Sequence, residues 1–85
     1  NCSGFTGDLT IPGGVITIQE RVFEGCTNIT NVNCYINKSI IDSGTNCFLN
    51  SGVTTIHARS TDSSWTAGSG QTIGGKTGIT VIKDL

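Results

Sequence analysis

The residue of this sequence best suited to proton transfer is its single histidine, His57. It stands at the centre of Ile56-His57-Ala58, where alternation places it on the polar side of a short strand beside Arg59. A general base also needs a nucleophile and an orienting acid within hydrogen-bond reach, and the 6 acidic residues form no cluster along the chain. We therefore expect His57 not to be catalytic and the protein not to be an enzyme.

A glycine-rich segment ends in Gly75-Lys76-Thr77, the tripeptide that closes phosphate-binding loops. Gly70 stands at the distance that such a loop requires, but the loop must also lead into a helix. The residues that follow, 78–82, alternate like a strand instead. The segment therefore predicts a turn-rich capping repeat rather than a phosphate site.

Three further classes of partner are excluded by cysteine spacing, charge and hydropathy. The 4 cysteines show no C-x-x-C or C-x-x-H spacing, so we expect no zinc site and no other cofactor. With 5 Lys and Arg against 6 Asp and Glu, the chain lacks the basic surface that nucleic acid requires. No apolar run approaches the roughly 20 residues that cross a bilayer, so we expect no membrane insertion.

The elements that must position any functional residue follow from a repeat. A chain of 85 residues fits one small domain, and its 12 glycines and single proline favour turns over long helices. Four triplets read apolar, polar, apolar, and their first members are 23, 24 and 23 residues apart: Leu9-Thr10-Ile11, Val32-Asn33-Cys34, Ile56-His57-Ala58 and Ile79-Thr80-Val81. Each triplet predicts a short strand with one buried face.

Two more rows of apolar residues keep nearly the same period. One is Ile18, Ile41 and Trp65, and the other is Phe23, Phe48 and Ile73. Units of this length cannot bury their apolar faces alone, so the rows predict a mainly β solenoid of about three stacked coils with single-turn helical segments. We place the coils at approximately 1–25, 26–51 and 52–77, the final strand at 78–85, and the single turn of helix at 19–22. Trp65 is expected inside the core or across its end.

The stretch from Leu9 to Val32 resembles the BspA-like leucine-rich repeat, whose unit reads roughly L-x-I-P-x-x-V-x-x-I-x-x-x-x-F-x-G-C-x-x-L-x-x-V. The matching residues are Leu9-Thr10-Ile11-Pro12, Val15, Ile18, and Phe23-Glu24-Gly25-Cys26-Thr27-Asn28-Ile29-Thr30-Asn31-Val32. Ile and Val replace most leucines, and residues 60–78 lack the Phe and the Gly-Cys pair, as in a terminal capping repeat.

The resemblance implies a curved, non-catalytic solenoid in an extracellular protein, on a bacterial or protist cell surface or on a virion, that binds host molecules. Residues 1–7 look like the tail of a preceding copy. We therefore expect a single repeat domain over residues 1–85 that forms the C-terminal part of a longer protein. An interrupted first coil would leave Leu9, Ile11, Ile18 and Phe23 facing solvent.

The repeat also brings two cysteines together. Cys2 and Cys26 occupy equivalent positions on adjacent coils, so a disulfide is geometrically allowed and would place the protein in an oxidising compartment. The resembling family carries this cysteine as a small buried apolar residue, and we therefore expect both thiols to be reduced.

What remains for function is the outward side of the strands. Alternation places five polar or aromatic residues side by side as candidate ligand-binding residues: Asn31, Asn33, Tyr35, His57 and Arg59. They suit a host-surface glycan or protein, as at the tip of a surface adhesin or a phage tail receptor-binding protein. The alternative is a structural stalk or oligomerisation tip, whose partners would be the rest of its own longer chain or further copies in a homo-oligomer.

Overall fold

The computed structural model of the chain describes residues 7–15, 18, 23–44 and 46–85. Strand is the main regular structure of these residues, beside one short helix, which confirms the expected mainly β class. In chain order the elements are β1 (Gly7–Ile11), β2 (Ile29–Cys34), α1 (Lys38–Ser43), β3 (Thr55–Ala58), β4 (Gly68–Ile73) and β5 (Lys76–Ile82).

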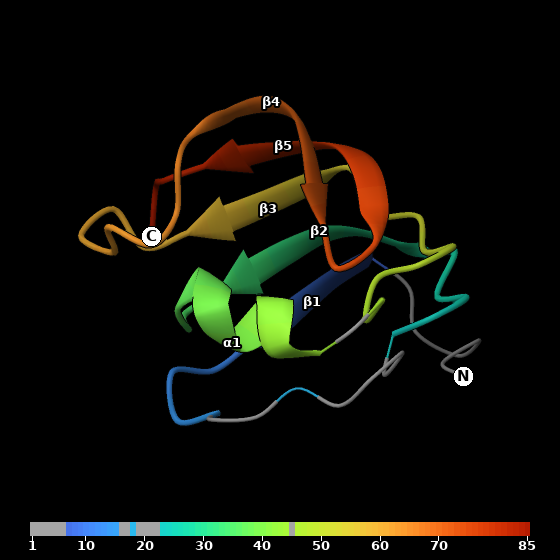
Figure 1. The fold of residues 1–85 in the computed structure, drawn as a ribbon, viewed down its shortest axis with the longest axis horizontal. Coiled ribbons are helices and arrows are strands. Elements are labelled where there is room, and N and C mark those ends of the chain that lie inside the picture. The colour runs from blue at the N-terminus through green and yellow to red at the C-terminus, as the bar shows by residue number, and fades with distance from the viewer. Residues whose placement is uncertain (1–6, 16–17, 19–22, 45) are drawn as a thin grey trace.

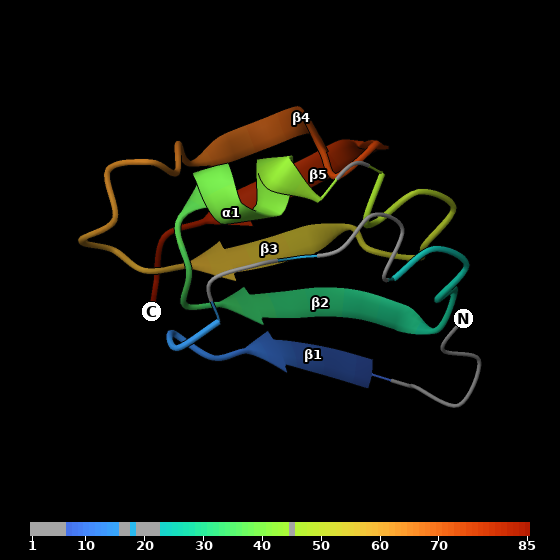
Figure 2. The same cartoon turned by 60° about the horizontal axis from the view of Figure 1, so that its bottom comes forward.

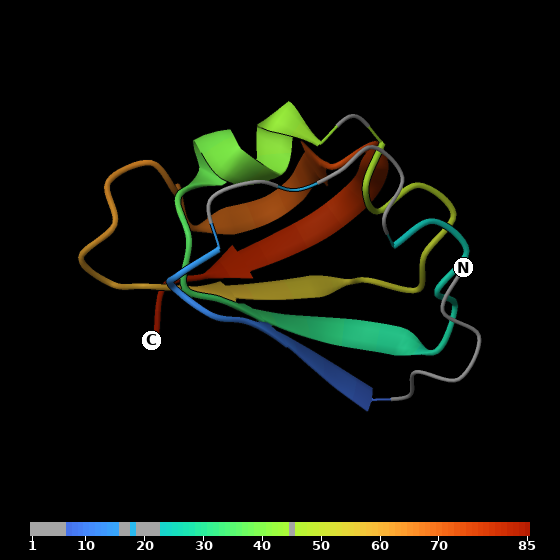
Figure 3. The ribbon, with the colours of Figure 1, turned by 90° about the horizontal axis from the view of Figure 1, so that it is seen from below.

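All five strands belong to one sheet with the order β1-β2-β3-β5-β4. Neighbouring strands from β1 to β5 run parallel, and β4 is antiparallel to β5 (Figures 1 and 2). Parallel neighbours need a connection that crosses over one face of the sheet. Figure 3 shows α1 on one side of the sheet, and no described helix or strand covers the opposite side.

The register of the sheet follows the repeat. Leu9 pairs with Val32 and Val32 with Ile56, as their spacing predicts. The last step differs, because Ile56 pairs with Val81 rather than with Ile79. A shift of two residues keeps the same side chains inward, so alternation identifies the correct face but not the partner. Both Ile79 and Val81 are buried.

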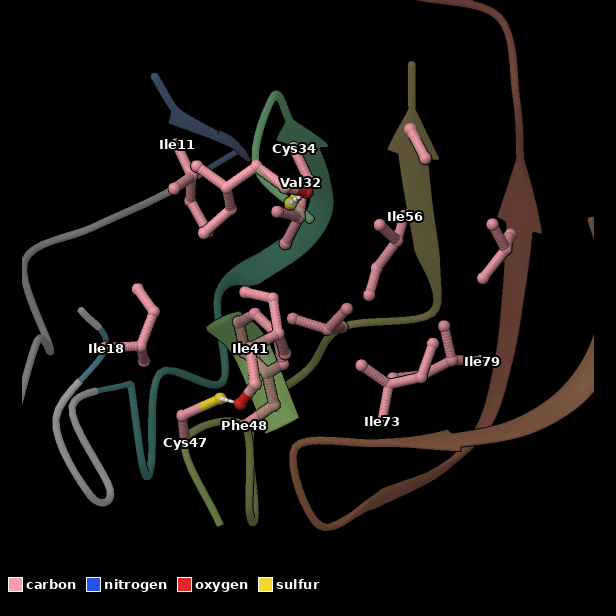
Figure 4. Close-up of a cluster of buried hydrophobic side chains, with 14 of the residues drawn as sticks. Ile11, Ile18, Val32, Cys34, Ile41, Cys47, Phe48, Ile56, Ile73 and Ile79 are labelled. Carbon is pink, nitrogen blue, oxygen red and sulfur yellow. Dashed lines mark hydrogen bonds between the residues drawn. The ribbon is translucent and has the colours of Figure 1, made fainter. Parts of the chain in front are cut away.

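The core lies between the sheet and the crossover segments, where the remaining apolar rows meet (Figure 4). Ile18, Ile41 and Trp65 are all buried, and Trp65 Nε1 donates a hydrogen bond to the Ile36 carbonyl at 2.9 Å. In the other row, the rings of Phe23 and Phe48 stack with centroids 5.6 Å apart. Both rows and the buried position of Trp65 are therefore confirmed.

Two side chains expected at an open end of the core are instead covered. Ile11 and Ile18 are only 4% and 8% exposed, while Leu9 and Phe23 are partly buried against the core. The chain turns immediately after β1, where the Val15 N–H bonds the Pro12 carbonyl at 3.2 Å, and Ile18 then lies in the core. The expectation that all four face solvent is wrong.

Two elements differ from the sequence-based expectation. The helical turn predicted at 19–22 lies outside the described residues, and the helix of the described part is α1, with Ile41 buried. β4 replaces part of the expected turn-rich cap. It joins β5 through Gly74 and Gly75, whose φ angles of 58° and 83° suit the two-residue turn of a tight hairpin. The Gly-Lys-Thr sequence therefore starts a strand, not a helix.

Gly74 provides a stability test, because a Cβ at this position would lie 2.7 Å from both Cys47 Sγ and Phe48 Cδ2. Gly74→Ala therefore combines crowding with a strained positive φ, and we expect it to lower the free energy of unfolding by about 1 to 3 kcal/mol in urea denaturation. Gly70→Ala, with a positive φ but open space, should cost less, and Gly14→Ala, with neither problem, should be nearly neutral. Equal effects at Gly74 and Gly14 would contradict this packing.

Candidate functional site

The open side of the sheet, here called the outer sheet face, carries rows of outward side chains. Parallel pairing sets them side by side on neighbouring strands. The first row is Asp8, Asn31, Thr55 and Thr80, and the second is Thr10, Asn33, His57 and Ile82. Residues in such rows are about 4.8 Å apart, so a ligand could contact several strands at once.

A third row lies just beyond the strand ends. Tyr35 and Arg59 follow the paired residues Cys34 and Ala58, and both are exposed. The parallel pattern continues beside Arg59, because the Leu85 N–H bonds the Ala58 carbonyl and the Ser60 N–H bonds the Leu85 carbonyl. The five predicted residues thus lie on β2, on β3 and at the ends of these strands, and their role as a binding site stays a prediction.

His57 has an acidic partner that the sequence did not reveal. Its Nδ1 lies 2.9 and 3.0 Å from the two carboxylate oxygens of Asp84. In the part of the chain that the structure describes, no hydroxyl or thiol is hydrogen-bonded to the imidazole. The pair links the C-terminal segment to β3 without forming a nucleophile–base arrangement.

The two asparagines also bond to neighbours. Asn33 Nδ2 donates to Thr10 Oγ1 at 3.5 Å, and Asn31 Nδ2 donates to Thr30 Oγ1 at 3.4 Å; both bonds are long and therefore weak. Among the described residues, the side chains of Tyr35 and Arg59 make no hydrogen bond or ion pair. These two are the candidates most available to a ligand.

A polar pocket is formed by residues that follow β2 and β3. Its volume is about 290 Å³, and it is lined by Asn37, Arg59, Thr61, Asp62 and Ser63. Of the five predicted residues only Arg59 lines this pocket. The other four do not: Asn31, Asn33, Tyr35 and His57. The turn-forming run 60–64 signals a loop in the sequence, but nothing in it indicates a pocket.

The cysteines fall into two classes. Cys26 is disulfide-bonded, so the expectation that it is reduced is wrong. Cys2 lies outside the described residues, and its spacing of 24 from Cys26 makes it the partner we expect. Equivalent positions on adjacent coils lie within the range that a disulfide spans, which is the physical reason to expect Cys2 as the partner.

Cys34 and Cys47 are free and buried in the core. Burial raises the pKa of each thiol from 9.0 to about 11 by disfavouring the thiolate, and a nearby Asp62 acts in the same direction on Cys34. In the described residues, no three His, Cys, Asp or Glu side chains are grouped as metal ligands. The described helix is also too short and polar to cross a membrane.

Thiol titration tests this assignment. Without reductant, denatured protein should show two reactive thiols, and after reduction it should show four. In the native state at pH 8 the two core thiols should react slowly, because burial limits access and a pKa of about 11 keeps them protonated; raising the pH towards 11 should accelerate the reaction. Four thiols in unreduced, denatured protein would contradict the disulfide at Cys26.

Comparison with known protein families identifies a repeat family. A family model described as a BspA type leucine rich repeat region, in 6 copies, matches residues 1–69. No curated protein and no solved structure matches this chain in the corresponding searches. The matched range covers β1, β2, α1 and β3. Paired residues of the three strands, such as Leu9, Val32 and Ile56, are 23 to 24 residues apart, which is the period of the repeat. The chain therefore belongs to the BspA-type leucine-rich repeat family, as predicted from the similarity of residues 9–32 to the repeat unit of that family.

Proposed function

We propose that this chain is a non-enzymatic binding module that attaches a bacterial surface adhesin or a phage tail receptor-binding protein to a host-surface glycan or protein. Membership in the BspA-type repeat family supports an interaction or adhesion role and an extracellular location, at a cell surface or on a virion. The ligand site of this proposal is the outer sheet face, with Asn31, Asn33, Tyr35, His57 and Arg59.

The proposed architecture is a solenoid of about three coils. Its support is the in-register parallel pairing of β1, β2, β3 and β5 at intervals of 23 to 25 residues. Such a stack holds outward side chains on a rigid backbone, so a ligand need not order them on binding. A rigid polar face is the kind of surface that recognises a specific partner.

The observation that carries the proposal is that the side chains of Tyr35 and Arg59 are exposed and make no hydrogen bond or ion pair with the described residues. They directly follow the paired residues Cys34 and Ala58, both are exposed, and Tyr35 has 39% of its surface accessible. Tyrosine and arginine dominate binding hot spots because each combines apolar contact with directional donors. Exposed Ile82 adds a second large apolar side chain to the same face.

A structural stalk has one observation in its favour. The side chains of His57 and Asn33 hydrogen-bond to Asp84 and Thr10, so part of the hydrogen-bonding capacity of the outer sheet face is used within the chain. A stalk or oligomerisation tip would need nothing more from this face than solubility. The two functions therefore differ in what they require of Tyr35 and Arg59.

Single substitutions distinguish the two functions. If the face binds a ligand, Tyr35→Ala and Arg59→Ala should each weaken binding to intact host cells or to a glycan array by about 1 to 2 kcal/mol. Ser39→Ala, an exposed change on α1 at the opposite side of the sheet, is the matched control and should bind as the parent does. Unchanged binding in both test variants, with circular dichroism showing an intact fold, would leave the stalk as the function.

A further inference from the structure

The polar pocket beside Arg59 is formed where the parallel strands end. Figures 1 and 2 show the loop between β3 and β4 extending beyond the carboxyl end of β3, near the C-terminus. Arg59, Thr61, Asp62 and Ser63 come from this segment, and Asn37 precedes α1 on the neighbouring coil. All five lining residues are polar, so the pocket is unsuited to an apolar ligand.

Several lining groups are available to a ligand. Asn37 precedes α1 but makes no capping hydrogen bond with its side chain. In the described part of the chain, the hydroxyls of Thr61 and Ser63 have no hydrogen-bond partner, and Arg59 has no ion pair. The pocket therefore offers one guanidinium, one amide and two hydroxyls for recognition.

The two carboxylates next to Arg59 are engaged elsewhere. Asp62 Oδ1 accepts bonds from the N–H and hydroxyl of Ser64 at 2.9 and 2.6 Å. Asp84, which follows β5, pairs with His57 of the second row. The charge of Arg59 is thus left for an anion, while Asp62 Oδ2 remains able to accept a bond from a ligand hydroxyl.

The pocket walls are held in place before any ligand arrives. Ser64 Oγ accepts a bond from the backbone N–H of Lys38 at 2.9 Å, which ties the loop to the start of α1. Trp65 Nε1 bonds the Ile36 carbonyl at 2.9 Å, and the Ser60 N–H bonds the Leu85 carbonyl at 2.9 Å. Loop ordering therefore costs little on binding.

From these observations we infer that the pocket binds one acidic sugar residue, with Arg59 on its carboxylate and with Asn37, Thr61, Ser63 and Asp62 on its hydroxyls. A neutral sugar would leave the positive charge of Arg59 unpaired. A dianion without hydroxyls, such as sulfate, would be repelled by the Asp62 carboxylate and could not donate a hydrogen bond to it. The volume of about 290 Å³ lies at the lower limit of ligand pockets, which suits a single ring. Tyr35 lies two residues before Asn37 and follows β2 as Arg59 follows β3, so it offers an aromatic face to an adjoining ring.

This inference rests on the proposed binding function and names the ligand class for it. The test uses methyl glucuronide and methyl glucoside, which differ only in the carboxylate, added to the complete isotope-labelled chain while amide shifts are followed by NMR. We expect methyl glucuronide to bind about tenfold more tightly, with shifts at Asn37 and residues 59–64. Sodium sulfate should produce weaker shifts at the same positions.

Two charge-removing variants are matched for this test. Arg59→Gln should abolish the preference for the glucuronide, so that both sugars bind equally weakly. Lys76→Gln removes a cation at the start of β5, outside the pocket, and should keep the preference. Equal binding of both sugars by the parent chain, a preference that survives in Arg59→Gln, or sulfate binding as tight as glucuronide would each overturn the inference.

The outcome separates this inference from the broader proposal. If cells or neutral glycans are bound through Tyr35 while the glucuronide shows no preference, the binding module stands and the acidic-sugar pocket is wrong. If glucuronide binds through Arg59 but attachment to cells is unaffected by Tyr35→Ala and Arg59→Ala, the pocket stands and the attachment function is wrong.

Discussion

Every part of this molecule depends on sharing a core between neighbouring strands. A strand of four to seven residues cannot remove its own apolar side chains from water, so each needs a partner one repeat away. β2 shows the arrangement most clearly, because it pairs with β1 on one side and β3 on the other and buries Val32 completely. The same stacking that closes the core aligns the outward residues, so the order of the outer sheet face is a by-product of burial.

The parts of the fold that follow from periodicity could be predicted. The positions of β1, β2 and β3, their inward residues and the rows containing Ile41 and Phe48 all come from spacing alone. The register of β5 could not be obtained this way, since alternation is unchanged by a shift of two residues. β4 was missed because Gly68–Ile73 has almost no apolar alternation and gains its partner through a hairpin.

The candidate site also has a part that periodicity predicts and a part that it does not. Alternation is sufficient to put Asn33, His57 and their neighbours on one face. The pocket is different, because its loop is positioned by bonds between Lys38 and Ser64 and between Ile36 and Trp65, residues 26 and 29 apart in the chain. The pairing of His57 with Asp84 spans 27 residues in the same way. These hydrogen bonds do not recur from one repeat to the next, so the spacing of the repeat cannot predict them.

The antiparallel hairpin gives the sheet two unlike edges. β1 ends the parallel series at one edge of the sheet, while β4 forms the other edge and runs antiparallel to its neighbour β5. A further repeat would continue the parallel series at β1, whereas at β4 it would meet a strand that runs against this series, so the array has a polarity. In evolution, a family built this way could lengthen its reach by adding units at one side, while the segment around Arg59 keeps a constant distance from the hairpin. The number of repeats could then change without altering the segment around Arg59.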